Sequence, residues 1–269
     1  MNIEDREFNQ ICNFMHHNYG INLVKKRSLI EGRLSQVISA SGYPDFKAYT
    51  AAVIQDEKLQ QQMVTRLTTN FTFFQRESMH YDYMVKEAIP TLLKAYPHKN
   101  SLKLWSAGCS SGDEAYTASI YLREMSLLNR RVGTYLIHAT DISDKVLEQA
   151  KSGCFSDDSL KNISPEIRKR YFTNLPDGRW KISPLIADSV RFSKLNLMNV
   201  FPPTFRSFDI IFCRNVMIYF TPEIREALAQ KYYDALVPGG YLFIGMSETI
   251  PASRIGFQVM RPSVFRKEG

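Results

Sequence analysis

The sequence predicts an α/β fold in which an all-helical region, residues 1–95, precedes a mostly parallel sheet domain, residues 96–269. Two observations support this prediction. Up to about Ala95, apolar residues recur at spacings of three and four, which is typical of amphipathic helices. From Leu102 onward, short apolar runs alternate with helical segments, which is typical of a parallel sheet with helical crossovers.

Length and composition exclude several classes of protein. The chain has 269 residues, of which 44% are hydrophobic, enough for a full α/β domain and a smaller one. No apolar run approaches the ~18 residues of a membrane span and the N-terminus lacks a signal-peptide core, so we expect a cytoplasmic protein without membrane insertion. The four cysteines are scattered and no histidine has a partner at metal-binding spacing, so we expect no disulfide and no metal. The net charge of +7 indicates an acidic partner, either nucleic acid or an acidic protein surface.

Four helices are expected in the N-terminal region, and a fifth leads into the sheet. The first runs from Glu4 to Tyr19 and ends at Gly20, because glycine readily adopts the backbone conformation that closes a helix. The other expected helices are Lys25–Ser39, Phe46–Ile54, Lys58–Leu67 and Tyr81–Leu93, the last of them broken by Pro90.

Seven strands are expected in the sheet domain. They are Leu102–Trp105, Tyr135–Ala139, Val190–Ser193, Phe208–Phe212, Tyr241–Gly245, Phe257–Met260 and Ser263–Arg266. The helices expected between them are Glu114–Leu128, Asp144–Lys151 and Pro222–Leu236. The alternation stops after Tyr171, and Leu175–Trp180 has the composition of a hairpin turn. We therefore expect a small antiparallel β insertion at about 171–187.

The segment from Leu102 to Glu114 reads as a strand, a glycine turn and the start of a helix, and a second strand ends at Asp141. This is the layout of a nucleotide-binding βαβ unit, in which an acid at the end of the second strand binds ribose hydroxyls. Ala107 takes the place of the first glycine of the dinucleotide pattern, so no pyrophosphate cradle is evident. A ligand with ribose and adenine but no phosphates fits better, and S-adenosylmethionine is the common one.

Two further motifs are more specific, Leu67–Glu77 (LTTNFTFFQRE) and Ile211–Phe220 (IFCRNVMIYF). Together with Trp105–Glu114 (WSAGCSSGDE), they closely resemble the CheR family, the S-adenosylmethionine-dependent methyltransferases that esterify glutamates on bacterial chemoreceptors. The resemblance covers nearly the whole chain in the same order. It implies a Rossmann-like class I methyltransferase sheet, S-adenosylmethionine as cofactor and S-adenosylhomocysteine as product. It also implies a monomer recruited to membrane-bound receptor arrays, with the cytoplasmic domains of methyl-accepting chemotaxis receptors as partners.

The resemblance also implies roles for individual residues. The cofactor would be bound by Asn70, Thr72, Arg76, Gly108, Gly112, Glu114, Asp141, Asn196, Leu197, Cys213, Arg214 and Asn215. Within that set, Glu114 would reach the methionine part, Asp141 the ribose, and Asn196 with Leu197 the adenine. Arg76, Arg214 and Tyr219 would be catalytic. A glutamate is already ionised at neutral pH, with a pKa of about 4.3, so the site needs donors that position a carboxylate and needs no general base.

The N-terminal region would dock the receptor through Lys25, Lys26, Arg27 and Arg33, whose simpler interpretation is a solvated basic face. The β insertion looks compact, as in relatives that bind no receptor tether peptide. Two alternatives remain open. A nucleic-acid methyltransferase would suit the positive charge, but no N/D-P-P-Y/F motif and no Pro-Cys nucleophile is present, so we expect no nucleic-acid partner. A non-catalytic cofactor-binding scaffold would not need Arg76, Arg214 and Tyr219.

Overall fold

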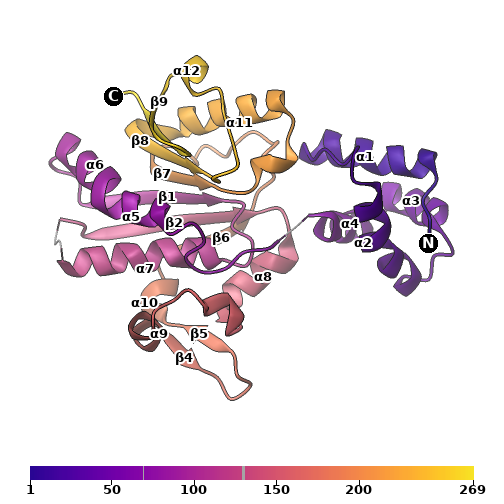
Figure 1. Cartoon of the computed structure of the whole chain (residues 1–269), viewed down its shortest axis with the longest axis horizontal. Helices are drawn as coiled ribbons and strands as arrows, with labels where there is room; N and C mark the ends of the chain where they lie inside the picture. Colours follow the sequence, from indigo (N-terminus) through magenta and orange to yellow (C-terminus); the bar gives the residue numbers. More distant parts are fainter. Residues whose placement is uncertain (69, 129–130) are drawn as a thin grey trace. The chain divides into compact units, whose positions relative to one another are not determined.

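The computed structural model describes residues 1–68, 70–128 and 131–269, and contacts divide the chain into two compact units (Figure 1). The first unit comprises Met1–Asn70 and Tyr219–Ile224, and the second comprises Phe71–Ile218 and Arg225–Gly269. The helical segment from Met79 to Ala95 therefore lies in the second unit, although the sequence predicts that it belongs to the N-terminal helical region. Among the described residues, no helix is both long and apolar enough to cross a bilayer.

The first unit is all helical, as predicted. Its helices are α1 (Asp5–Tyr19), α2 (Arg27–Ala40), α3 (Phe46–Gln55) and α4 (Glu57–Leu67). Gly20 ends α1 with a φ of 70°, and its N–H donates to the carbonyl oxygen of His16. The carboxylates of Asp45 and Asp56 accept backbone N–H groups at the starts of α3 and α4, which are otherwise without intrahelical partners. The apolar faces meet in a core formed by Ile30, Leu34, Ile38, Tyr49 and Val64.

The second unit is built on a seven-stranded sheet of order β6-β2-β1-β7-β8-β10-β9, which confirms the predicted fold. The first five strands in that order are parallel, and β10 pairs antiparallel with both β8 and β9. The strands are β1 (Ser101–Ala107), β2 (Thr134–Asp141), β6 (Val190–Lys194), β7 (Phe208–Cys213), β8 (Leu236–Ile244), β9 (Phe257–Arg261) and β10 (Val264–Lys267). Every residue of β7 is buried, as expected for a central strand that is covered on both faces.

Helices cover both faces of this sheet (Figure 1). After β1, α7 (Asp113–Leu128) leads to β2, and α8 (Asp144–Ser152) follows β2. After β7 and η3 (Met217–Tyr219), α11 (Pro222–Ala235) leads to β8 on the face opposite α7, and α12 (Ala252–Ile255) precedes β9. The strand order reverses direction between β1 and β7, so their crossovers run on opposite faces, and ligands of such folds bind at the carboxyl ends of the strands at this point.

Pro90 does not break its helix, contrary to the prediction. The chain stays helical through α5 (Met79–Tyr83), the π-helical turn η1 (Met84–Ala88) and α6 (Ile89–Ala95). The N–H of Ile89 donates to the carbonyl oxygen of Met84, five residues earlier. In a regular α-helix the proline ring would clash with the carbonyl group of residue i−4, and the wider π turn relieves that clash.

The β insertion lies between α8 and β6. Its antiparallel sheet has the order β3-β5-β4, formed by β3 (Cys154–Phe155), β4 (Phe172–Asn174) and β5 (Trp180–Ile182). The helices η2 (Asp158–Leu160), α9 (Pro165–Tyr171) and α10 (Pro184–Ala187) complete it. The predicted hairpin is β4 and β5, whereas β3 is only two residues long and gave no pattern in the sequence. The rings of Phe155 and Phe172 pack edge-on against Phe74, at centroid distances of 4.8 and 5.4 Å.

Gly108 and Gly178 offer a matched pair for testing the turn after β1. Their φ angles are 88° and 80°, so alanine pays a similar left-handed backbone cost of about 1–2 kcal/mol at both positions. A Cβ at Gly108 would also lie 2.4 Å from Cγ2 of Val216, whereas a Cβ at Gly178 would meet nothing within 4 Å. We expect Gly108→Ala to lower the melting temperature clearly more than Gly178→Ala in calorimetry. Equal losses would mean that the Val216 contact is relieved without cost.

Candidate active site

Three loops meet at the carboxyl edge of the sheet, where ligands of open α/β folds bind. The loop after β1 contains Gly108 and Gly112, the loop after β2 follows Asp141, and the loop after β7 contains Arg214 and Asn215. Because β1 lies between β2 and β7 in the sheet, these predicted cofactor residues are brought to neighbouring positions.

Backbone hydrogen bonds tie the first of these loops to the second. The N–H groups of Gly108 and Cys109 both donate to the carbonyl oxygen of Thr140, at 2.8 and 2.9 Å. The next N–H, that of Ser110, donates to Oδ2 of Asp141 at 2.9 Å. Gly112 ends the turn with a φ of 92°, and a Cβ there would lie 3.0 Å from the Cβ of Ala150. The glycines therefore allow a tight turn packed against α8.

Asp141 lies at the tip of β2 and is almost fully buried. Its Oδ1 accepts the N–H of Ser143 at 3.0 Å, while Oδ2 accepts that of Ser110. Burial raises the pKa of the Asp141 carboxyl above its usual value, although these backbone donors oppose the shift. Each carboxylate oxygen has a second lone pair, so the group retains the capacity to accept two ribose hydroxyls.

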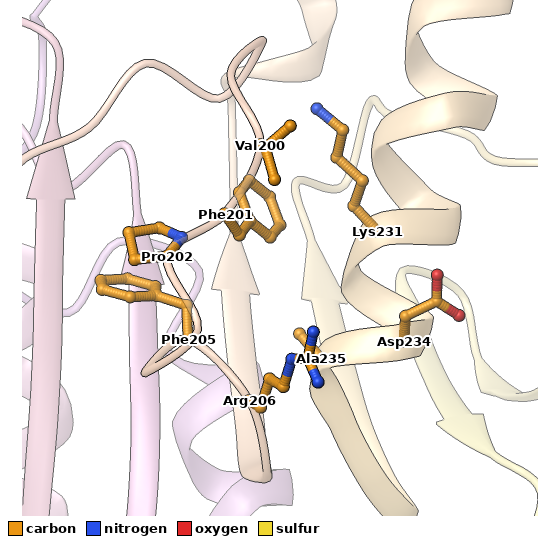
Figure 2. A pocket seen from close by; sticks show the side chains of 8 residues that line it. All are labelled: Val200, Phe201, Pro202, Phe205, Arg206, Lys231, Asp234 and Ala235. Carbon is orange, nitrogen blue, oxygen red and sulfur yellow. The ribbon is translucent and has the colours of Figure 1, made fainter.

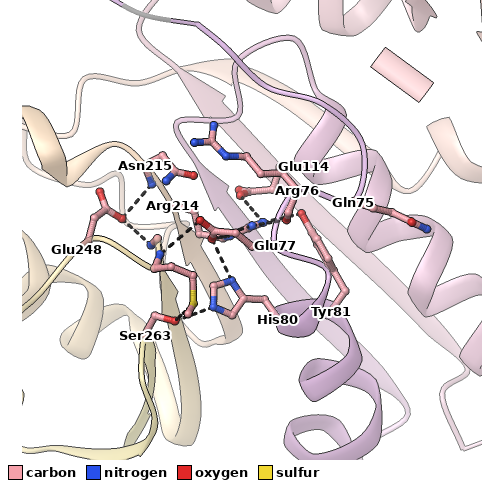
Figure 3. A network of polar contacts seen from close by, with 12 residues as sticks. Gln75, Arg76, Glu77, His80, Tyr81, Glu114, Arg214, Asn215, Glu248 and Ser263 are labelled. Carbon is pink, nitrogen blue, oxygen red and sulfur yellow. Dashed lines mark hydrogen bonds and ion pairs between the residues drawn. The ribbon is translucent and has the colours of Figure 1, made fainter. Parts of the chain in front are cut away.

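Arg214 is the centre of a buried ionic network (Figure 3), and its side chain is only 2% exposed. Its Nη1 donates to the hydroxyl of Tyr81 at 2.8 Å and to Oε2 of Glu114 at 3.3 Å. Its Nε and Nη2 donate to Oε2 of Glu77 at 3.3 and 3.0 Å. Nη2 also donates to the carbonyl oxygen of Arg76. A guanidinium has five N–H donors, and these contacts use all five.

The two carboxylates of the network differ in their surroundings. Glu114 also accepts a hydrogen bond from the hydroxyl of Ser106 at 2.7 Å, and burial raises its pKa although Arg214 opposes the shift. Burial works in the same direction at Glu77, but there the guanidinium of Arg214 outweighs it and lowers the pKa. Burial opposes the charge of Arg214 itself, and the neighbouring Tyr81, Glu114 and Glu77 more than compensate, so its pKa is raised.

Glu248 is a site residue that the sequence did not reveal. Its Oε2 accepts the N–H of Asn215 at 2.9 Å, and its Oε1 accepts the N–H of Ile218 at 3.1 Å. Oε2 also accepts the N–H of Gly245, where a Cβ would lie 2.8 Å from the same oxygen. The carboxylate thus fixes the loop after β7 to the end of β8. A lone glutamate on a polar turn has no sequence signal that separates it from a solvated one.

The loop before α5 carries predicted residues of the motif Leu67–Glu77. The N–H of Phe74 donates to the carbonyl oxygen of Ser159 in the β insertion at 3.1 Å, and the N–H of Gln75 donates to the hydroxyl of Thr117 in α7 at 3.1 Å. The guanidinium of Arg76 donates to the carbonyl oxygen of Phe71 at 2.9 Å. It lies 5.9 and 6.0 Å from the ring centroids of Phe71 and Phe73, within cation–π range.

The other predicted cofactor residues have different surroundings. Asn196 and Leu197 follow β6, and this loop is joined to β2 where the N–H of Leu195 donates to the carbonyl oxygen of Asp141 at 3.0 Å. Cys213 is fully buried at the end of β7, and Thr72 is half-buried in the second unit. Asn70 and Tyr219 belong to the first unit, where the carbonyl oxygen of Tyr219 accepts the N–H of Asn22 at 2.9 Å.

Of the four predicted docking residues, two make contacts inside the first unit. Arg27 donates to the carbonyl oxygen of Ile3 at 2.8 Å and pairs with the carboxylate of Asp5. Arg33 donates to carbonyl groups at the end of α4, including that of Leu67 at 3.2 Å, and to that of the next residue, Thr68, at 3.0 Å. The side chains of Lys25 and Lys26 are exposed. The positive charge that this group exposes at the surface therefore comes mainly from the two lysines.

The imidazole and the two thiols near Arg214 are poorly suited to act as a general base. Burial lowers the pKa of His80 to about 4, with the charge of Arg214 adding to the effect, so its imidazole is uncharged at neutral pH. The ring is 2% exposed, and its Nε2 lies 2.7 Å from the hydroxyl of Ser263. Burial also raises the pKa of the Cys109 and Cys213 thiols well above the usual value. The arrangement therefore suits a reaction whose nucleophile arrives already ionised.

The low pKa of His80 makes stability depend on pH. Between about pH 6.5 and pH 4 the unfolded chain carries a proton on this residue that the folded protein lacks. Its contribution to stability is therefore complete above pH 6.5 and is lost as the pH falls towards 4. We expect His80→Gln to reduce the loss of unfolding free energy over this range by about 2–3 kcal/mol, measured by urea titration. The exposed His98→Gln variant should keep the wild-type slope, and a wild-type slope in His80→Gln would refute the assignment.

Comparison with known proteins identifies the family. Residues 70–265 match the CheR methyltransferase SAM-binding domain, and residues 6–68 match the CheR methyltransferase all-alpha domain. The chain is 36% identical to the chemotaxis protein methyltransferase of Borreliella burgdorferi, over 99% of this chain and 96% of the relative. It is 33% identical to the chemotaxis protein methyltransferase of Salmonella typhimurium, over 91% of this chain and 84% of the relative. S-adenosylmethionine is therefore its cofactor, and the chain belongs to the CheR family of methyltransferases.

Proposed function

We propose that this protein is a protein-glutamate O-methyltransferase that esterifies glutamates on the cytoplasmic helical bundle of chemoreceptors, in chemotaxis adaptation. The methyl group would pass from S-adenosylmethionine to the glutamate carboxylate, leaving S-adenosylhomocysteine. The name of the Borreliella burgdorferi relative supports the chemotactic role. An enzyme that methylates the cytoplasmic part of these receptors would itself be cytoplasmic.

The observation that carries the proposal is the lack of a usable base around the buried guanidinium of Arg214. Amines and alcohols must lose a proton before or during methyl transfer, and a glutamate carboxylate need not. His80 is buried and, with a pKa of about 4, only weakly basic, while Cys109 and Cys213 are held as thiols. The carboxylates of Glu77 and Glu114 are both paired with Arg214. Among the described groups of this network, therefore, none is suited to accept a proton from the substrate.

Residues of this edge fit S-adenosylmethionine, which would supply an electrophilic methyl group on a cationic sulfur. Asp141 would accept the ribose hydroxyls, and Glu114 would face the methionine part. One guanidinium between two carboxylates leaves a net charge of −1 in the network, which complements a cationic ligand. The bond from the carboxylate oxygen to the methyl carbon forms as the methyl–sulfur bond breaks, and no proton moves.

Arg214 and Arg76 would then have different tasks. All five donors of Arg214 are engaged, and Glu77 and Glu114 cancel its positive field, so it would act by positioning Glu114 and the loop before α5. Arg76 is partly exposed beside Phe71 and Phe73, so it would be the cation that orients the incoming glutamate. Positioning of this kind can supply roughly 7–11 kcal/mol of the barrier. The catalytic role of Tyr219 stays a prediction.

Asp141→Asn tests the cofactor orientation. The amide keeps the size of the side chain and can still accept one backbone N–H, but it removes the charge that strengthens hydrogen bonds to ribose. We expect the Kd for S-adenosylhomocysteine to rise at least tenfold in calorimetry, since such bonds contribute about 1.5–3 kcal/mol each. Asp144→Asn is the control, because Asp144 is exposed and pairs with Lys194 at 2.6 Å. Unchanged affinity in a folded Asp141→Asn protein would remove Asp141 from the site.

Receptor docking would depend on Lys25 and Lys26 more than on Arg27 and Arg33, which already have partners within the first unit. We expect the double variant Lys25→Glu, Lys26→Glu to raise the KM for receptor without changing cofactor affinity, and salt to reduce the difference. The control is Lys47→Glu, Lys58→Glu, which makes the same charge change at exposed positions of α3 and α4. Equal effects of the two double variants would assign the result to net charge alone.

A direct assay tests the function itself. The protein is incubated with labelled S-adenosylmethionine and a receptor cytoplasmic domain, and the product is treated with base. Glutamate methyl esters release volatile methanol, whereas methylated bases and amines do not, and a scaffold would transfer no label. In the same assay we expect Arg76→Gln to lower kcat at saturating cofactor while the Kd for S-adenosylhomocysteine stays close to that of the wild type. Label that resists base would refute the proposal.

A further inference from the structure

Lys231 binds three successive carbonyl groups of the loop between β6 and β7. Its Nζ donates to the carbonyl oxygens of Leu197, Met198 and Asn199, each at 3.1 Å. The side chain comes from α11 and is half-buried, and its ammonium lies 5.3 Å from the ring centroid of Phe201. In Figure 2 it reaches towards the Val200–Phe201 segment across a cavity of about 440 Å³.

These three carbonyl groups need the ammonium for a physical reason. They converge on one point, as the last carbonyl groups of a helix do, and their partial negative charges repel one another. Unpaired carbonyl groups in a partly buried loop cost free energy unless a donor or water satisfies them. Without Nζ the segment from Leu197 to Asn199 would relax towards water, and the buried side chain of Leu197 would lose its fixed position.

The same loop lies beside the ribose-binding acid. β6 pairs in parallel with β2, and the N–H of Leu195 donates to the carbonyl oxygen of Asp141. A ribose held by Asp141, with the methionine part towards Glu114, would place the adenine on the far side of Asp141 from β1. That direction leads to the loop after β6, because β6 is the next strand in the sheet.

A second lysine secures the other end of the loop. Nζ of Lys103 donates to the carbonyl oxygens of Thr204 and Arg206, at 2.7 and 2.8 Å. Between the two lysines, the rings of Phe201 and Phe205 pack edge-on against Trp105, at 4.8 and 4.9 Å. The Lys103 end is therefore anchored close to the start of β7, and Lys231 binds three carbonyl groups of the segment beside Asp141.

We propose that Lys231 is a positioning residue for the cofactor, which sets affinity by holding the Leu197–Asn199 segment against the adenine without contacting the ligand. The proposal rests on the cofactor orientation given under the proposed function. It assigns Lys231 to binding and not to methyl transfer. Lys231 acts on binding through the adenine, which S-adenosylmethionine and S-adenosylhomocysteine share.

The test replaces Lys231 with methionine, which keeps an apolar stem over Phe201 and removes the ammonium. We expect the Kd values for S-adenosylmethionine and S-adenosylhomocysteine to rise by about the same factor, roughly tenfold, which corresponds to about 1.4 kcal/mol. A direct effect of the lysine charge on the ligand would instead change the two affinities unequally, because only S-adenosylmethionine carries the sulfonium charge. We expect kcat at saturating cofactor to stay within twofold of wild type, with the KM for cofactor raised.

Lys267→Met is the matched control. Nζ of Lys267 donates to the carbonyl oxygens of Tyr233 and Leu236, at 2.8 and 2.9 Å, so it makes the same kind of contact at the end of α11, away from the β6–β7 loop. We expect Lys267→Met to lower the melting temperature but leave both Kd values within twofold. Hydrogen exchange should become faster at residues 195–200 in Lys231→Met only.

If Lys231→Met does not fold, Lys231→Gln provides the measurement, since its amide can satisfy part of the carbonyl set and should give an intermediate rise in both Kd values. Wild-type affinity in either folded Lys231 variant would overturn the proposal, as would an unequal change for the two ligands. Wild-type protein that does not bind S-adenosylhomocysteine would instead refute the cofactor orientation, so the two failures are distinguishable.

Discussion

The buried charge of Arg214 is the constraint on which the rest of the site depends. A guanidinium that is 2% exposed is tolerable only if its donors are satisfied, and its four acceptor atoms come from two segments far apart in the chain. They include Glu77 before α5, Tyr81 within it and Glu114 at the start of α7. Removing one partner of a buried pair typically costs about 3–5 kcal/mol, because the other charge is left uncompensated. The network therefore fixes the relative positions of α5, α7 and the loop after β7.

This constraint also separates the electrostatic tasks of the site. Two carboxylates around one guanidinium create a local excess of negative charge at the edge where a cationic cofactor is expected. The same excess would repel the carboxylate of the proposed glutamate substrate, so a second cation outside the network would be needed to admit it. A partly exposed arginine resting on two aromatic rings is suited to that purpose, because a weakly hydrated, planar cation loses little solvation there.

Much of the fold could be predicted from the sequence because its signals are local. The apolar strands, the glycine turn after β1 and the acid at the end of β2 lie where alternation and spacing put them. Pairings between distant segments gave no such signal. The four acceptor atoms of Arg214 lie on residues 76 to 114, at least 100 positions away in the chain, and only the pairing of β7 with β8 brings Glu248 to the loop after β7. The strand β3 was missed because two residues carry no period. The helix around Pro90 was predicted, but its continuity was not, because a π turn leaves no composition signal.

Three residues other than glycine adopt positive φ angles around the buried guanidinium: Gln75 at 58°, Glu77 at 52° and Asn215 at 60°. Each such conformation costs on the order of 1 kcal/mol, and the hydrogen bonds of the network offset that cost. The contacts and the backbone geometry are therefore thermodynamically linked. Once one contact is removed, the strained residues can relax and the remaining contacts weaken. Free-energy changes measured for single substitutions at Glu77 and Asn215 should consequently be non-additive, and only a double-mutant cycle would apportion the coupling between them.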